Sequence, residues 1–108
     1  MAIVKITKEN FVDEVLGAGA PVIIDFYADW CGPCKMLAPT LEELSEERED
    51  IKFCKINVDD EPELAAAFEI TVIPTLAAMK DGALLAKNTG VIGKKSILGM
   101  LPDNTTPV

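Results

Sequence analysis

Apolar and polar positions along the chain form blocks that predict both strands and helices. Apolar runs in the first half are each followed by a segment with apolar residues at helical spacing, which is typical of parallel strands joined by helices. Two later runs flank Asp81-Gly82, a strong signal for a tight hairpin turn. The predicted strands span residues 3–6, 22–28, 51–58, 75–79 and 83–86.

The first predicted helix follows the first strand. Thr7 is its expected N-cap, and Gly17 and Gly19 are expected to end it. Its apolar residues recur at helical spacing, so they are expected to form one buried face of the helix. That face consists of Phe11, Val12, Val15 and Leu16.

Three further helices complete the predicted order. One extends from a cysteine pair to about Arg48, one begins at Pro62, and the last spans residues 94–101 with Gly99 inside it as a weak point. The apolar stripe of the helix after Pro62 consists of Leu64, Ala67 and Phe68. The order predicts an α/β fold in which a parallel βαβ unit and an antiparallel ββα unit share a central mixed β-sheet, with helices on both faces.

Length and charge narrow the classes of function. The 108 residues are expected to form one domain, with a polar tail from about Pro102. The formal net charge is -8 and the basic residues are scattered, so nucleic acid and anionic membrane surfaces are unfavourable partners. The first residues show no basic segment followed by a long apolar run, which favours a cytoplasmic location.

The cysteine pair lies in the stretch DFYADWCGPCKM, residues 25–36. Cys31 is placed where a strand has ended and a helix begins, so unpaired backbone N–H groups and the helix dipole favour its thiolate. Cys34 follows one helical turn later and is expected to face inward beside Cys31, a spacing that allows a disulfide. Pro33 suits the first helical turn, and Gly32 lets another backbone approach closely.

Asp25 is a carboxyl group in the middle of a strand that is expected to be buried on both faces. Burial favours the protonated form, and a carboxyl group with a raised pKa can take the proton from Cys34 when that thiol must become a nucleophile. The alternative is an inert ion pair with Lys55 on a neighbouring strand. The base role is the favoured hypothesis, and pairing with Lys55 does not exclude it.

Other cysteine chemistry is less compatible with the sequence. Structural zinc needs four Cys or His ligands, whereas the chain has one close pair, the isolated Cys54 and no histidine. Haem attachment requires a histidine after Cys34, where Lys35 stands. Cys54 is predicted to be a buried apolar residue, with a redox-sensing thiol as the alternative. A non-enzymatic scaffold, a disulfide oxidase and an isomerase also stay open.

WCGPCK at residues 30–35, preceded by the strand with Asp25 and followed later by Ile73-Pro74-Thr75, resembles the thioredoxin family. Pro39, Lys55, Asp81-Gly82 and Gly90 extend the resemblance over nearly the whole chain. The resemblance implies the thioredoxin fold and a protein-disulfide reductase. Cys31 would attack the disulfide of a partner protein, and Cys34 would resolve the mixed disulfide, leaving a Cys31–Cys34 bond.

The same resemblance implies the partners and the rest of the site. It implies a cis bond between Ile73 and Pro74, no bound cofactor or metal, disulfide-containing client proteins, recycling by an NADPH-linked thioredoxin reductase, and a monomer. Tyr27 stands where many thioredoxins have tryptophan, which predicts a more polar surface. The implied docking surface, exposed and largely apolar, consists of Trp30, Gly32, Pro33, Ile73, Pro74 and Gly90.

Overall fold

The computed structural model of the protein describes residues 3–102, and a five-stranded mixed sheet organises them. The strands lie in the order β1-β3-β2-β4-β5. β3 pairs in parallel with β1 and β2, whereas β4 pairs antiparallel with β2 and β5. Their bounds are β1 Ile3–Lys5, β2 Val22–Tyr27, β3 Lys52–Asn57, β4 Thr75–Lys80 and β5 Ala83–Thr89. The tail expected after Pro102 lies outside the described residues.

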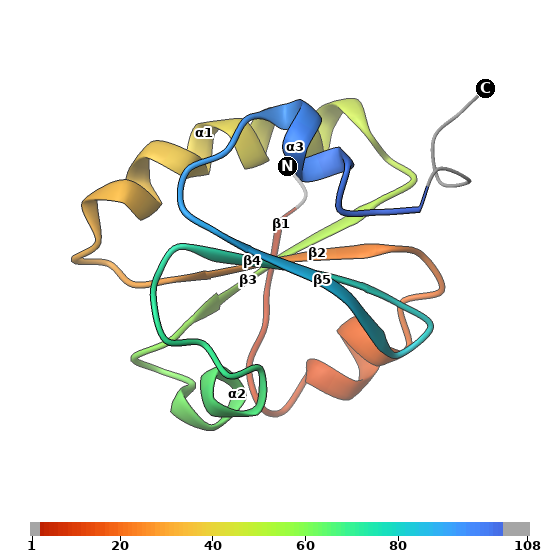
Figure 1. Ribbon diagram of the computed structural model, residues 1–108. Helices are drawn as coiled ribbons and strands as arrows, with labels where there is room; N and C mark the ends of the chain where they lie inside the picture. The colour runs from red at the N-terminus through yellow and green to blue at the C-terminus, as the bar shows by residue number, and fades with distance from the viewer. Residues whose placement is uncertain (1–2, 103–108) are drawn as a thin grey trace.

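Helices pack on both faces of this sheet, as predicted (Figure 1). α1 (Gly32–Glu47) and α3 (Lys94–Leu98) lie on one face. α2 (Pro62–Ala67) and a short π-helix, η1 (Val12–Leu16), lie on the other. β2 and β4 are buried on both faces, which explains why their sequences are almost continuously apolar. Large buried side chains on the α1 face include Ile23, Leu37, Leu44, Phe53, Leu76 and Ile97.

The first predicted helix is the element that differs most from expectation. The Thr7 side chain does not cap it; the Thr7 N–H donates to Asn10 Oδ1 at 2.7 Å, and the helix begins after Phe11. Val15 is buried, but Val12 and Leu16 are 63% and 41% exposed. Phe11 packs with Val15 against the same core, so the buried face of this segment is narrower than predicted and leaves out Val12 and Leu16. The predicted end at Gly17 is confirmed.

Two later helices are shorter or more exposed than predicted. α3 ends at Leu98 because Gly99 caps it, although Met100 and Leu101 beyond it remain buried. In the stripe predicted for α2, Phe68 is buried but Ala67 is exposed. The short length of α2 leaves too few turns for a complete buried face.

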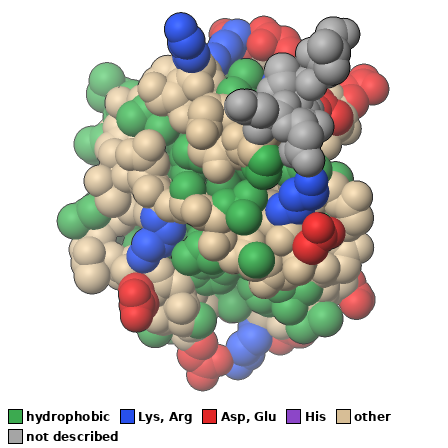
Figure 2. Space-filling view, turned by 45° about the vertical axis from the view of Figure 1, so that its right-hand side comes forward, with side chains coloured by type: hydrophobic (Ala, Val, Ile, Leu, Met, Phe, Trp, Pro, Cys, Tyr) green, Lys and Arg blue, Asp and Glu red, His purple; other side chains and the backbone are tan. Residues whose placement is uncertain are grey.

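The hairpin between β4 and β5 confirms the signal from Asp81-Gly82. Both residues have positive φ, 52° and 80°, as a type I′ turn requires. β5 is an edge strand, and its Lys87 Nζ donates to the carbonyl of Phe68 at 2.7 Å, which ties the edge to the end of α2. Figure 2 shows hydrophobic side chains gathered over the middle of one face of the molecule, with charged side chains around its margin.

Candidate active site

The cysteine pair lies at the N-terminus of α1. Cys31 is the N-cap residue, and its Sγ accepts a hydrogen bond from the Cys34 N–H at 3.2 Å. The two sulfurs form a disulfide, with the Cα atoms 5.3 Å apart, and both residues are 4% exposed. Pro33 occupies the first helical turn, as predicted. In the reduced protein, the same N–H group and the helix dipole would stabilise a Cys31 thiolate.

The residues expected to surround the pair differ in exposure. Trp30 is 71% exposed, and its Nε1 donates to Asp59 Oδ2 at 2.8 Å. Gly32 and Pro33 are exposed, and Ile73 is half-buried against the cysteines. The role of Asp59 was missed, because nothing in the acidic run after β3 indicates which carboxylate reaches the indole.

The bond between Ile73 and Pro74 is cis, as expected. The expected exposure of the Pro74 side chain is wrong, because the ring is less than 2% exposed. The Pro74 carbonyl accepts a hydrogen bond from the N–H of the half-buried Gly90 at 2.9 Å. Gly90 has φ of 92°, which explains why glycine is suited to this position. The Pro74 side chain therefore lies beneath the surface that Ile73 and Gly90 form, and is not itself available for contact.

An apolar groove of about 420 Å³ begins beside Trp30. Sequence reasoning identified Trp30 and Ile73 in it but missed its other residues, although Thr71 and Val72 directly precede Ile73. Val72 is 53% exposed and available for contact. The groove is lined by Trp30, Val58, Ala65, Ile70, Thr71, Val72 and Ile73.

A second cavity, of about 420 Å³, brings together the predicted residues Asp25, Cys34 and Lys55. Asp25 is 7% exposed, and its Oδ1 is buried without a hydrogen-bond partner. Burial raises the pKa of Asp25 to about 7 from its ordinary value of 3.8, and the positive charge of Lys55 acts against that rise. The cavity therefore contains, beside Cys34, a carboxyl group that changes charge near neutral pH.

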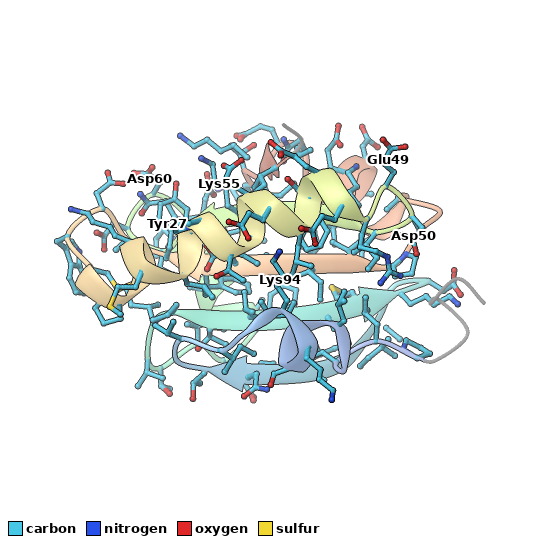
Figure 3. All side chains as sticks on the ribbon, turned by 90° about the horizontal axis from the view of Figure 1, so that it is seen from above. Tyr27, Glu49, Asp50, Lys55, Asp60 and Lys94 are labelled. Atoms are coloured by element: carbon cyan, nitrogen blue, oxygen red, sulfur yellow. A yellow bond between two sulfur atoms is a disulfide. The ribbon has the colours of Figure 1, made fainter. Side chains whose placement is uncertain are left out.

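Lys55 stands opposite Asp25 in the parallel register of β2 and β3. Between these two described side chains there is nevertheless no ion pair. The Lys55 Nζ lies 5.9 Å from the centroid of the Tyr27 ring, and both residues are beside α1 in Figure 3. The inert ion pair between Lys55 and Asp25 is therefore not formed. The positive charge of Lys55 acts on Asp25 from beyond ion-pair distance.

Cys54 lies on the opposite face of the sheet from this cavity. It is 2% exposed, unpaired with another cysteine, and packed among apolar residues that include Ile24 and Ile56. Burial raises the pKa of its thiol to about 11. The prediction of a buried apolar residue is confirmed.

Comparison with known proteins decides the family. The family model described as Thioredoxin matches residues 2–102. The chain belongs to the thioredoxin family. Thioredoxin of Mycobacterium tuberculosis (strain ATCC 25618 / H37Rv) is 45% identical over 103 residues, which cover 94% of this chain and 89% of that protein.

Two further relatives are similar over nearly all of this chain. A Mycobacterium leprae (strain TN) protein named bifunctional thioredoxin reductase/thioredoxin is 41% identical over 101 residues, covering 93% of this chain and 22% of that protein. The crystal structure of oxidized mitochondrial thioredoxin 3 from Saccharomyces cerevisiae superposes with a TM-score of 0.82 at 37% identity. That match covers 91% of this chain and 92% of the yeast chain.

Family and geometry together establish the class of activity. The chain has the thioredoxin fold and is a thiol–disulfide oxidoreductase with the redox-active pair Cys31–Cys34. Among residues 3–102 there is no cluster of three or more His, Cys, Asp or Glu side chains suited to a metal ion, so nothing there supports the zinc alternative. Nor does any helix in that range have the length and hydrophobicity to span a membrane.

Proposed function

We propose that the protein reduces disulfides in client proteins, with Cys31 as the nucleophile and Cys34 as the resolving thiol. The Cys31 thiolate attacks one client sulfur, and the other client sulfur leaves as a thiolate that takes up a proton. Cys34 then loses its proton and attacks Cys31 Sγ, which releases the second client sulfur. The client gains two electrons and two protons, and the chain is left with the Cys31–Cys34 disulfide. The position of Cys31 at the N-terminus of α1 is the observation that carries this assignment.

Asp25 is the proposed general base of the resolving step. Its carboxyl group shares a cavity with Cys34 and has a pKa of about 7, so its ionised form is available to accept the Cys34 proton at neutral pH. Lys55 favours that ionised form through its positive charge. The base role therefore depends on two opposing effects: burial raises the pKa of Asp25, and the positive charge of Lys55 limits that rise without forming an ion pair.

Client docking is proposed on the surface around Cys31. Trp30, Gly32 and Pro33 supply one side, and Ile73 and Gly90 the other, with the buried Pro74 supporting them. The backbone of Ile73 can pair with an extended client segment and hold its disulfide in line with Cys31.

The electron donor is proposed to be an NADPH-linked thioredoxin reductase, since the Mycobacterium leprae relative is named for both activities in one protein. In this proposal residues 1–108 act as a single-domain monomeric electron carrier in the cytoplasm, without a bound cofactor or metal. The acidic net charge of -8 makes nucleic acid and membrane surfaces unfavourable partners.

The decisive experiment is turnover of insulin disulfides with NADPH and a bacterial thioredoxin reductase. We expect NADPH oxidation that depends on both the chain and insulin, and no turnover with Cys31→Ser. Turnover that persists in Cys31→Ser, or a wild-type chain that is reduced by dithiothreitol yet never transfers electrons to insulin, would contradict the proposal.

A further inference from the structure

Four side chains form a cluster on the α1 face of the sheet. Asp25 and Tyr27 alternate on β2, and Lys55 and Asn57 stand opposite them in the register with β3. Because alternate strand residues point to the same face, all four lie on the side of the sheet that α1 covers. The cavity beside Cys34 is lined by three of them, Asp25, Tyr27 and Lys55.

The position of the Lys55 ammonium group is the unexpected feature. A lysine directly opposite a buried carboxyl group would ordinarily pair with it, yet the buried Asp25 Oδ1 has no hydrogen-bond partner. The Lys55 Nζ instead lies 5.9 Å from the Tyr27 ring centroid, within the distance of about 6 Å at which a cation is attracted to an aromatic ring. The ring offers the ammonium group a position outside ion-pair contact with Asp25.

The Tyr27 ring stays uncharged at neutral pH, and its cross-strand neighbour is Asn57. Asn57 stands opposite Tyr27 in the register of β2 and β3, and Asn57 Oδ1 accepts from the N–H of Asp59 at 2.9 Å and of Asp60 at 3.3 Å. Burial, followed by the negative charge of Asp29, raises the pKa of Tyr27. The hydroxyl therefore stays protonated while Asp25 titrates.

Other charged groups face the same cavity. Asp29 approaches from the loop after β2, and Lys35 and Glu42 approach with Cys34 from α1. On the other side of β2, the residue paired with Asp25 is the apolar Leu76 of β4. Burial has the largest effect on Asp25, and Lys55 supplies the charge that acts on it.

We propose that Tyr27 is a positioning residue of the resolving step, because its ring holds the Lys55 ammonium out of ion-pair contact and leaves the Asp25 carboxylate free to take the Cys34 proton. The inference rests on the proposed role of Asp25 as the base. Without the ring, Lys55 would move onto the carboxylate, which would then titrate at lower pH and be a weaker, occupied base.

The test is a carbon-13 NMR titration of the Asp25 side chain in Tyr27→Leu. We expect its midpoint to fall by about one pH unit relative to wild type. Tyr27→Phe keeps the ring and should keep the wild-type midpoint, as should Tyr27→Trp. If Tyr27→Leu does not fold, Tyr27→Met removes the ring with a side chain of closer length and carries the same expectation.

A Lys55→Met background separates the ring's effect on Lys55 from mere hydration of the cavity. In that background, Tyr27→Leu should leave the Asp25 midpoint unchanged, because the ammonium group that the ring positions has been removed. The inference is overturned if the shift persists without Lys55, if Tyr27→Leu causes no shift with Lys55 present, or if Tyr27→Phe shifts as much as Tyr27→Leu.

Kinetics of the resolving step distinguish this inference from the proposed function. If Asp25→Asn leaves the rate of mixed-disulfide resolution and its pH profile unchanged, the base role fails even though the NMR shift is seen. If Asp25→Asn slows resolution but Tyr27→Leu moves neither the midpoint nor the pH profile, the base role stands and the positioning role fails.

Discussion

The same two strands present different chemistry on their two faces. Toward α1, β2 and β3 place Asp25 and Lys55 beside a cavity that reaches Cys34. Toward α2, the alternate residues Ile24, Cys54 and Ile56 pack in an apolar layer. Both faces contain a cysteine, but only the α1 face places its cysteines at a helix N-terminus and beside a titrating carboxyl group.

The contrast shows that the surroundings decide the reactivity of a thiol. Cys31 accepts a hydrogen bond from the backbone N–H of Cys34 at the positive end of a helix, which favours a thiolate. Cys54 packs in an apolar layer, and burial raises the pKa of its thiol to about 11. The face toward α1 is therefore suited to redox chemistry and the face toward α2 to packing.

The largest expected effect comes from breaking the reactive pair. Cys31→Ser should abolish disulfide reduction, whereas Cys34→Ser should still attack and then stall as a mixed disulfide, because no second thiol is adjacent. Mass spectrometry of the trapped adduct after proteolysis locates the linked cysteine. Cys54→Ala is the matched control and should turn over like wild type. An adduct that formed through Cys34 in preference to Cys31 would reverse the assignment.

The second prediction concerns the cost of keeping a carboxyl group on a buried strand. The pKa of Asp25 is about 7 in the folded protein against 3.8 as its ordinary value, so the folded state retains a proton that the unfolded state has lost between about pH 4 and pH 7. Stability therefore falls as pH rises through that window and levels off above it. Asp25→Asn should remove the fall and raise the free energy of unfolding by up to about 4 kcal/mol near pH 8.

Urea unfolding at several pH values measures this difference. The gain of Asp25→Asn over wild type should shrink steadily as the pH is lowered toward about 4. The exposed Glu49→Gln serves as a control that removes a carboxylate from the surface, and its stability difference should stay within about 0.5 kcal/mol. A gain for Asp25→Asn that did not depend on pH would point to packing as its cause.

The third prediction follows the same residue into catalysis. In Asp25→Asn the amide cannot accept the Cys34 proton, so resolution of the mixed disulfide should slow about a hundredfold near pH 7, equivalent to about 2.7 kcal/mol. The wild-type rate should rise with pH through about 7, where Asp25 ionises, and the variant should lack that rise. Stopped-flow measurement of the second phase of client reduction gives both quantities.

A control from the same cavity makes the kinetic test specific. Glu42 lines the cavity from α1, so Glu42→Gln also removes a carboxyl group near Cys34. It should leave the pH profile of the resolving step unchanged. A loss in Glu42→Gln equal to that in Asp25→Asn would assign the effect to the general charge of the cavity.

Much of the α1 face could be predicted from the sequence because its signals are local. Val22–Tyr27 is almost continuously apolar, and the only charged residue in it, Asp25, is conspicuous for that reason. The helix after the cysteines has leucines at helical spacing, and Cys34 falls in line with them, so its buried position follows from one pattern. The cis bond before Pro74 has no local signal and was expected only from the resemblance to the family.

The failures involve geometry that spacing alone does not determine. For η1, the prediction assumed an α-helical period, whereas the chain closes a wider turn in which the Gly17 N–H donates to the Val12 carbonyl at 2.9 Å. The ion pair between Lys55 and Asp25, which was the alternative to the base role, is not formed although strand register places the two residues opposite each other; the Lys55 Nζ lies 5.9 Å from the Tyr27 ring centroid instead. Competition between two partners depends on three-dimensional distances, which a one-dimensional pattern does not contain.

The smallest expected effect tests the apolar face directly. Cys54→Ala removes one heavy atom from a packed layer, so the free energy of unfolding should fall by about 1 kcal/mol without loss of disulfide reduction. In wild type, iodoacetamide should alkylate Cys31 of the reduced protein far faster than Cys54, whose thiol has a pKa of about 11 and is 2% exposed. Peptide mapping after a timed reaction compares the two cysteines in one sample. Rapid labelling of Cys54 in the folded protein, or lost turnover in Cys54→Ala, would mean that the second face also takes part in the redox chemistry.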